Sequence, residues 1–286
     1  MPEKKKVIIG GINGRMGRAS SRLLLDSDEF ELVGAYGKAD ANYVGLDLGE
    51  LLSLPKTGIK ISKDFNSANS NSKSAILLDN THAGPSIAAA KEALNAGVRP
   101  VLGTSGITEE QFQELGELAK QKKLGALVIP NFSIGAVLMM DFARQAGAYF
   151  ENVEIVEMHH TKKLDAPSGT AMHTMKKLAT ARDAFNRKEV DEHEMIEGSR
   201  GGLGQAGVRV HSLRLPGLIS HQEVIFGSPG ELLTVRHDSF NMDCFLSGIM
   251  MSLRFVNSID ELVIGLDNVL GLGGNTKARV AASTAK

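Results

Sequence analysis

The first 25 residues contain the feature that most narrows the possible folds: a short apolar run, a glycine-rich turn and a helix-like segment. The run from Val7 to Gly10 is typical of a buried parallel strand, and the helix-like segment continues to about Leu25. Between them, Gly11, Gly14 and Gly17 give the spacing G-x-x-G-x-x-G. Such a turn lets the backbone approach a pyrophosphate, while the helix N-terminus offers unpaired N–H donors. The same glycines also suit an ordinary β–α turn, so the preceding strand is what favours a dinucleotide site. The residues predicted to contact the cofactor here are Gly11, Asn13, Gly14, Arg15 and Met16.

Strand-like and helix-like segments go on alternating through the first half of the chain. Further strands are expected at 32–36, 75–78, 101–102 and 126–129, and helices at 87–94 and directly after Thr108, where Gln111 completes a capping-box pattern. This alternation predicts a parallel sheet covered by helices on both faces.

The pattern changes after Pro130 and Asn131, where we place a hinge. A helix is expected at 134–150, a strand at 153–158, a helix from about Ser168, a charged helix or loop at 182–197, and strands at 208–215, 222–226 and 232–236. Three successive strands without helices between them predict a second domain with an open mixed sheet. A helix at 245–256 is expected to return to the first domain, and the small-residue tail from Gly271 to be frayed.

The predicted fold class is α/β, with two domains. Residues 1–130 and 240–286 are expected to form a Rossmann-like dinucleotide-binding domain. Residues 131–239 are expected to form an α+β domain with an open mixed sheet.

Composition and charge exclude several classes of protein. With 32 Lys and Arg against 33 Asp and Glu, the chain lacks the basic excess that nucleic-acid binding draws on. The single cysteine, Cys244, excludes an internal disulfide framework and fits a reducing compartment. No apolar run is long enough to span a bilayer. We therefore expect a cytoplasmic protein that binds neither nucleic acid nor membranes.

The end of the second strand bears on the choice of cofactor. An NAD site usually has an acidic residue there that binds the ribose hydroxyls. Here the sequence is Ala35-Tyr36-Gly37-Lys38, with no carboxylate before Asp40. Lys38 is suited to a 2′-phosphate, together with Arg15 or Arg18, which predicts a preference for NADPH with NADH possible. A solvated surface lysine is the alternative.

Two more loops follow strand ends, where open α/β sheets bind ligands. The residues Asp79, Thr81, Gly103, Thr104 and Ser105 are predicted to line the nicotinamide side of the site. Residues of these types are also common in ordinary turns.

The stretch from Glu157 to Ala171, Glu-Met-His-His-Thr-Lys-Lys-Leu-Asp-Ala-Pro-Ser-Gly-Thr-Ala, carries the most chemistry. Its two histidines are adjacent at a strand end, so their side chains should diverge and no shared metal is expected. Histidine can exchange a proton near neutral pH, and the lysine suits a carboxylate or acid role. The Ser-Gly-Thr helix start offers a second anion site. Alone, a histidine pair is more often structural, but this combination predicts a pocket for a small acid with more than one carboxylate.

These residues resemble the dihydrodipicolinate reductase family. The resemblance is carried by the glycine turn, Gly103-Thr104-Ser105-Gly106, 130–135, 159–170, 209–217 and 221–227. It implies reduction of 4-hydroxy-tetrahydrodipicolinate by NAD(P)H after loss of water, in lysine and diaminopimelate biosynthesis.

The resemblance also implies roles for individual residues. His159 and Lys163 would be the catalytic acid pair, with the order of their proton transfers left open. The residues implied to hold the substrate carboxylates are His160, Ser168, Gly169 and Thr170, beside Lys163. Asn131 and Phe132 would contact the cofactor and belong to a hinge that closes the domains, with a second hinge near residue 240. The family forms homotetramers through the sheet of its second domain, so the resemblance implies that residues 131–239 serve both substrate binding and oligomerisation, as a homotetramer.

Several positions depart from the family pattern, one of which is the missing acidic residue after the second strand. Asn80 stands where an aromatic or aliphatic residue is usual, and Phe240-Asn241-Met242 stands where an arginine is common. A non-catalytic NADP-binding regulator is one alternative, supported only by Asn80 and Met242. An amino-acid dehydrogenase on the same architecture is the other, but those families lack the His-His-x-x-Lys block.

Overall fold

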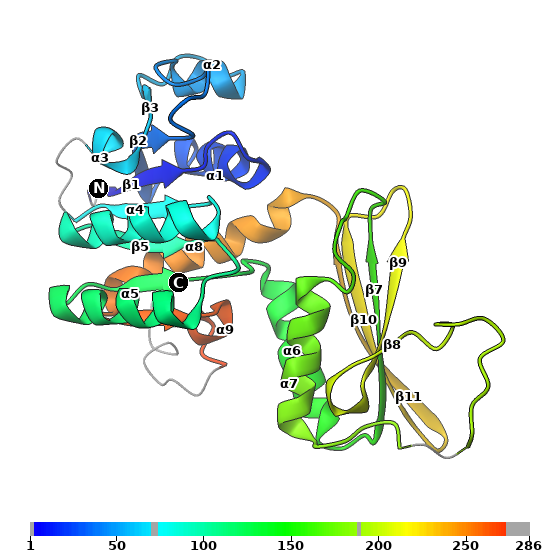
Figure 1. Cartoon of the computed structure of the whole chain (residues 1–286). Coiled ribbons are helices and arrows are strands. Elements are labelled where there is room, and N and C mark those ends of the chain that lie inside the picture. Colours follow the sequence, from blue (N-terminus) through cyan, green and yellow to red (C-terminus); the bar gives the residue numbers. More distant parts are fainter. Residues whose placement is uncertain (1–2, 70–73, 188–189, 273–286) are drawn as a thin grey trace. The chain divides into compact units, whose positions relative to one another are not determined.

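The computed structural model describes residues 3–69, 74–187 and 190–272 (Figure 1). The chain divides into a first unit, residues 1–133 with 245–286, and a second unit, residues 134–244. The boundaries lie slightly later in the chain than those expected from the sequence, 130/131 and 239/240. One reason is that Phe132 and Ser133 are buried, at 2% and 1% exposure. The predicted tail lies almost entirely outside the described residues.

The first unit is built on a seven-stranded sheet with the strand order β12-β6-β5-β4-β1-β2-β3, in which every pairing is parallel. Its strands are β1 (Lys5–Gly10), β2 (Phe30–Tyr36), β3 (Ile61–Ser62), β4 (Ile76–Asp79), β5 (Arg99–Leu102), β6 (Ala126–Val128) and β12 (Leu262–Ile264). Its helices are α1 (Arg15–Leu25), α2 (Leu48–Leu52), α3 (Phe65–Ala68), α4 (Ala83–Asn95), α5 (Glu109–Lys122), α8 (Leu246–Phe255), η3 (Val256–Ser258) and α9 (Leu266–Val269). The chain adds β2 and β3 on one side of β1 and then crosses to the other side, where it adds β4, β5 and β6. The sheet therefore has a topological switch point between β1 and β4.

The core of the first unit lies on both faces of this sheet. Val7, Ile8 and Ile9 of β1 have no exposed surface, as a doubly covered parallel strand requires. In Figure 1, α4 and α5 lie in front of the sheet and α8 lies behind it. The predicted capping box starts α5: the Thr108 hydroxyl accepts the Gln111 N–H at 3.3 Å, and the Gln111 side chain accepts the Thr108 N–H at 3.0 Å.

The second unit is a five-stranded sheet with two helices. Its elements are α6 (Ile134–Gly147), β7 (Asn152–His159), α7 (Gly169–Ala181), β8 (Gly202–Leu203), η1 (Gln205–Gly207), β9 (Arg209–Arg214), β10 (Ser220–Ser228) and β11 (Glu231–Ser239), with η2 (Met242–Phe245) at the unit boundary. The strand order is β11-β10-β7-β9-β8, and the β7–β9 pairing is parallel while the others are antiparallel. The predicted open mixed sheet and the α/β fold class are therefore confirmed.

The two faces of the second sheet differ. Alternate residues of β7, namely Val153, Ile155, Glu157 and His159, are buried. They lie on the face that packs against helices, where the β10 side chain of Gln222 donates to the α7 hydroxyl of Thr174 at 2.7 Å. We call the opposite face of this sheet the outer face. The described part of the charged segment 182–197 contains no helix.

Sequence reasoning missed the short elements. The helices α2, α3 and α9 and the strands β3, β8 and β12 have two to five residues, too few to show a clear hydrophobic period. In the part of the chain that the structure describes, no helix combines the length and the apolar character needed to cross a membrane.

Candidate active site

The glycine turn has a backbone that other residues would not allow. Gly11 has φ +72°, in the left-handed region that favours glycine. A Cβ on Gly17 would overlap the backbone of Gly11 and Ile12. Helix α1 begins after Gly14, whose N-cap position supplies no side-chain acceptor to the first N–H groups of the helix. The turn and the open helix end together form a cradle of the kind that binds pyrophosphate.

Asp79, predicted to contact the cofactor, is engaged by the protein itself. Its carboxylate is fully buried at the end of β4 and accepts hydrogen bonds from the Tyr36 hydroxyl and, at 2.5 Å, from the Thr81 hydroxyl. Burial, followed by the charge and hydrogen bond of Asp79, raises the pKa of Tyr36 well above its usual range. Asp79 therefore fixes the ends of β2 and β4 relative to each other. Thr81, also predicted, lies beside it.

Lys38 lies at the end of β2 and is largely solvated. Its ammonium pairs with Asp40 at 3.1 Å, and the two side chains are 78% and 72% exposed. Arg18, one of the two arginines considered for a 2′-phosphate, donates to the Asn13 side chain at 2.7 Å and to the Leu51 carbonyl at 2.6 Å. A bound phosphate could therefore replace the partner of Lys38 more easily than the two partners of Arg18.

The loop after β5 comes close to the end of β4. The Gly103 N–H donates to the Asp79 carbonyl at 2.8 Å, and the Phe132 ring lies beside Gly103. Thr104 is buried, with its hydroxyl directed to the Ser105 carbonyl, whereas Ser105 itself is exposed. The structure thus gathers the predicted residues Asp79, Thr81, Gly103, Thr104 and Phe132 at one edge of the first sheet. Asn131 uses its side-chain oxygen to accept the Ser133 N–H at 2.9 Å.

In the second unit, His159 is held by a buried carboxylate. Its Nδ1 lies 2.5 Å from Glu157, two residues earlier on the same face of β7. Arg214 from β9 binds both oxygens of Glu157, at 2.7 and 3.1 Å, and also donates to the Asp165 carbonyl at 2.9 Å. The arrangement anchors the histidine and the loop that follows it.

The charge on Glu157 decides which nitrogen of His159 carries a proton. Burial raises the pKa of Glu157, but hydrogen bonds from His159, Arg214 and Ser212 outweigh it and lower the pKa to about 2. A carboxylate that stays ionised can only accept, so Nδ1 of His159 is the donor. This leaves Nε2 to exchange a proton with a ligand.

His160 and Lys163 complete the predicted group. The Nδ1 atom of His160 is buried and has no hydrogen-bond partner within the described residues. The Lys163 N–H closes a turn onto the His160 carbonyl at 3.2 Å, and the Lys163 ammonium pairs with Asp165 at 2.7 Å. Asp165 is 62% exposed, so water or a ligand carboxylate can replace it at the lysine.

The predicted anion site at the start of α7 divides into two roles. Ser168 is buried, and its hydroxyl accepts the Ala171 N–H at 3.1 Å as the N-cap. Gly169 and Thr170 are the first two helical residues, whose N–H groups have no acceptor within a helix. A Cβ on Gly169 would meet no atom within 4 Å, so the approach to this end is open.

Sequence reasoning missed the residues that support this site. It assigns no role to Glu157, Arg214 or Asp165. Period-two spacing from His159 places Glu157 on the same strand face, which is a usable signal. Arg214 is 57 residues away from Glu157 in the sequence and meets it only through the β7–β9 pairing.

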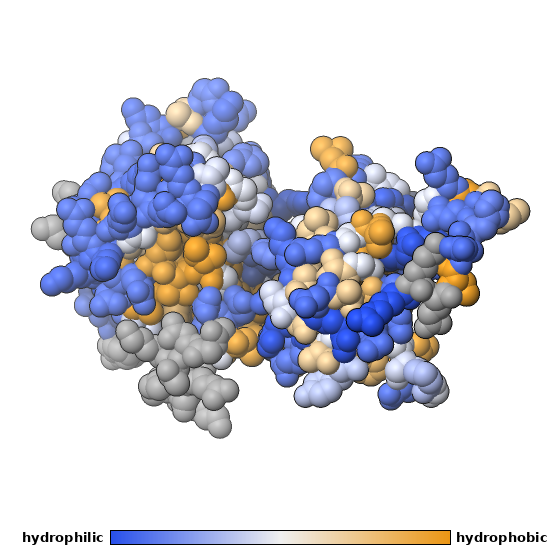
Figure 2. Space-filling model, turned by 60° about the horizontal axis from the view of Figure 1, so that its bottom comes forward, coloured by the Kyte–Doolittle hydropathy of each residue, from blue (hydrophilic) through white to orange (hydrophobic). Residues whose placement is uncertain are grey.

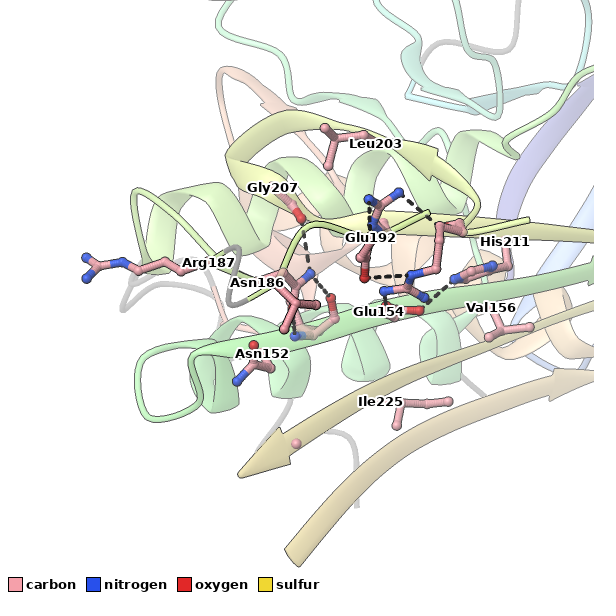
Figure 3. A pocket seen from close by; sticks show the side chains of 15 residues that line it. Asn152, Glu154, Val156, Asn186, Arg187, Glu192, Leu203, Gly207, His211 and Ile225 are labelled. Carbon is pink, nitrogen blue, oxygen red and sulfur yellow. Dashed lines mark hydrogen bonds and ion pairs between the residues drawn. The ribbon is translucent and has the colours of Figure 1, made fainter. Parts of the chain in front are cut away.

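A pocket of about 740 Å³ lies elsewhere, by the outer face of the second sheet (Figure 3). The predicted site residues are not among the residues described as lining it. Most of its charged side chains are paired with one another: Arg200 binds Glu154 at 2.7 Å and Glu192 at 3.1 Å, and His211 binds Glu154 at 2.7 Å. Arg187 also lines the pocket, and the structure describes no ion pair for its side chain. Both glutamates of the pocket are therefore occupied by cationic side chains of the protein itself.

A Rossmann-type unit with a glycine cradle, together with a unit carrying a carboxylate-oriented histidine and a lysine, defines a nicotinamide-dinucleotide-dependent oxidoreductase. Two family models cover nearly the whole chain: "Dihydrodipicolinate reductase, N-terminus" over residues 5–132 and "Dihydrodipicolinate reductase, C-terminus" over residues 135–270. The chain belongs to the dihydrodipicolinate reductase family, which confirms the resemblance.

Individual relatives match over their full length. A 4-hydroxy-tetrahydrodipicolinate reductase of Desulfitobacterium hafniense is 45% identical, over 94% of this chain and 99% of the relative. The 4-hydroxy-tetrahydrodipicolinate reductase of Synechococcus elongatus is 42% identical, over 92% of this chain and 98% of the relative. A solved dipicolinate-bound dihydrodipicolinate reductase from Paenisporosarcina sp. TG-14 has a TM-score of 0.82 at 42% identity, over 94% of this chain and 100% of that one. An amine dehydrogenase from Mycobacterium smegmatis, TM-score 0.65 and 15% identity, shares the fold alone.

Proposed function

We propose that this enzyme reduces 4-hydroxy-tetrahydrodipicolinate to tetrahydrodipicolinate with NAD(P)H, in lysine and diaminopimelate biosynthesis. The observation that carries the proposal is the Glu157–His159 pair beside a lysine and an open helix start. This set provides one proton-exchanging group and several positions for carboxylates. The curated relatives bear the same activity in their names.

The substrate is a ring with two carboxylates, and the second unit has cationic and N–H groups to bind them. We assign His160, Gly169 and Thr170 to the carboxylates, with Lys163 exchanging Asp165 for one of them. Ser168 acts through its cap, which fixes the first turn of α7. The dipicolinate bound to the Paenisporosarcina enzyme is a ligand of this class.

The glycine cradle fits a dinucleotide, since Gly17 packs so closely on the backbone of Gly11 and Ile12 that a Cβ there would overlap it, and no side chain caps the start of α1. The residues proposed to hold it are Gly11, Asn13, Gly14, Arg15, Met16, Thr81, Gly103, Thr104, Ser105, Asn131 and Phe132, with Asp79 bracing Thr81. When bound, the nicotinamide supplies hydride to C4 of the conjugated imine that forms as water leaves. His159 and Lys163 hold and move the accompanying protons.

We infer that NADPH is preferred and that NADH is accepted. The end of β2 carries Lys38 and no acidic residue before Asp40. An ammonium whose only described ionic contact is an exposed aspartate can bind a 2′-phosphate instead. We also propose that the first unit binds the dinucleotide, that the second binds the substrate, and that 131–133 and the segment near 240 act as hinges.

We further propose a cytoplasmic homotetramer assembled through the outer face of the second sheet. Apolar side chains on and beside that face include Leu203, Leu213 and Leu232, exposed by 69%, 37% and 77%. Figure 2 shows hydrophobic side chains among hydrophilic ones on the visible surface of this unit. Exposed apolar area on a sheet face is typical of a subunit interface.

The decisive experiment follows NADPH oxidation by absorbance while the synthase generates the substrate in situ. We expect turnover that requires both the synthase product and this enzyme. A rate no higher than that of the synthase mixture alone would overturn the proposed activity.

A further inference from the structure

Asn80 is a partly buried residue whose side-chain amide has no partner within the described residues. It directly follows β4, and its backbone N–H donates to the Gly10 carbonyl at 3.2 Å. Both Oδ1 and Nδ2 are shielded from solvent, and neither has a hydrogen-bond partner in the described part of the chain. An unpaired buried amide destabilises a protein, so a polar side chain here needs a reason.

The position of Asn80 supplies that reason. Gly10 pairs with Asp79 in the β1–β4 register, so Asn80 lies at the topological switch point, beside the glycine turn. A Cβ on Gly11 would lie 3.0 Å from the Asn80 carbonyl. A Cβ on Gly103 would lie 2.7 Å from the Asn80 Oδ1 and equally close to the Phe132 ring. The amide therefore packs against Gly103 and the Phe132 ring, next to the glycine turn.

Nearby polar groups already have protein partners. The Asp79 carboxylate is bound by Tyr36 and Thr81, and the Thr104 hydroxyl donates to the Ser105 carbonyl. The Asn80 amide differs from them in having both its donor and its acceptor unused within the described residues. Strand order decides which half of a dinucleotide it can reach: β2, with Lys38 at its end, flanks β1 on one side, and β4 flanks it on the other.

We propose that the Asn80 amide hydrogen-bonds the nicotinamide half of the bound dinucleotide and so contributes to cofactor affinity. An amide offers one acceptor and one donor group, which matches the nicotinamide carboxamide or a pair of ribose hydroxyls. The inference rests on the proposed function, because it requires NAD(P)H to bind at the glycine cradle. Asn80 is a positioning residue that acts on the orientation of the nicotinamide.

The test is Asn80→Leu, which keeps the shape and removes the polar atoms, with Asn80→Ala as a second variant that only deletes atoms. Binding is measured by titration calorimetry with NADPH and with adenosine 2′,5′-bisphosphate, which lacks the nicotinamide half. We expect both variants to weaken NADPH binding about tenfold, as loss of a hydrogen bond does. Their affinity for the bisphosphate should match that of wild type. The ligand-free Tm of Asn80→Leu should rise.

A matched control removes another buried polar atom that has no partner within the described residues. Ser20 of α1 has such a hydroxyl, and Ser20→Ala should leave the NADPH affinity unchanged. Unchanged NADPH affinity in the Asn80 variants, or equal weakening of both ligands, would overturn the inference while leaving the proposed function intact. If the wild-type protein bound neither NADPH nor the bisphosphate, the proposed function would be overturned, and this inference with it.

Discussion

At the scale of single residues, the Glu157 carboxylate is proposed to affect both the chemistry and the acid stability of the second unit. It is fully buried, yet hydrogen bonds from His159 and Arg214 keep it ionised. Glu157→Gln keeps the size of the side chain and removes its charge. The amide can also donate a hydrogen bond, so His159 is no longer forced to carry its proton on Nδ1. We expect kcat to fall roughly tenfold or more. Measured kcat and KM would show the fall mainly in kcat, and a wild-type kcat would remove Glu157 from the mechanism.

The same carboxylate predicts a pH dependence of stability. Its folded pKa of about 2 lies below the ordinary value of 4.5, so its contribution is complete above pH 4.5 and is lost as the pH falls towards 2. The Tm of wild type should therefore drop across that window. Glu157→Gln should be less stable at pH 7, and its Tm should vary less between pH 4.5 and 2. Parallel Tm profiles for the two proteins would contradict this.

The two proposed acids give a sharper test of catalysis. His159→Gln should lower kcat by roughly a hundredfold or more, with a smaller effect on KM, because proton donation in the transition state is lost. Lys163→Ala should lower kcat and also raise KM, because the Lys163 ammonium is proposed to bind a substrate carboxylate. The matched control is Lys162→Ala, which alters the exposed neighbouring lysine and should retain wild-type kinetics. Wild-type rates in both site variants would defeat the assignment.

Cofactor choice is also decided at the residue scale. Lys38→Glu reverses the charge at the end of β2 and should lower the ratio of NADPH to NADH efficiency by roughly tenfold. Asp40→Asn removes the present partner of Lys38 and should move the ratio the other way. The measurement is kcat/KM with each cofactor. A ratio unchanged in both variants would remove Lys38 from cofactor recognition.

At the scale of elements, the N-cap residues of α7 and α5 allow an effect on stability to be separated from an effect on substrate binding. Ser168→Ala leaves the Ala171 N–H of α7 without its cap and should cost about 1 kcal/mol of stability. It should also raise KM for the substrate, since the first turn of α7 is proposed to bind a carboxylate. Thr108→Ala removes the cap of α5 in the other unit and should cost stability alone. Equal KM values in the two variants would argue against an anion site on α7.

The predictable elements were those whose signal is local. The Thr108 capping box and the helix start near Ser168 were visible in the sequence because three or four residues specify each of them, whereas the capping role of the Ser168 hydroxyl came only from the structure. Strand β12 was missed because three residues at a sheet edge show no period, and only pairing with β6 defines it. The candidate site follows the same rule. The histidines and Lys163 could be predicted from one short stretch, whereas Arg214 reaches Glu157 through long-range strand pairing.

At the scale of the whole molecule, the second sheet has one face that its own helices do not bury. Helices α6 and α7 pack on the face that carries Val224 and Phe226, both fully buried. Ile225 alternates with them on the outer face and lines the pocket there with Val156, next to ion pairs that are already neutralised. An apolar surface with paired charges suits another copy of the chain better than a small ligand.

Ile225→Asp tests this assembly, because it places an unpaired charge at the centre of the proposed interface. Burial of that charge would be costly, so the proposed tetramer should dissociate into smaller species. Sedimentation velocity measures the change directly. Tyr149→Asp is the matched control, since Tyr149 is 85% exposed and lies after α6, outside the outer face; it should sediment as wild type. If Ile225→Asp sedimented as a tetramer like the wild-type protein, the interface would have to lie elsewhere.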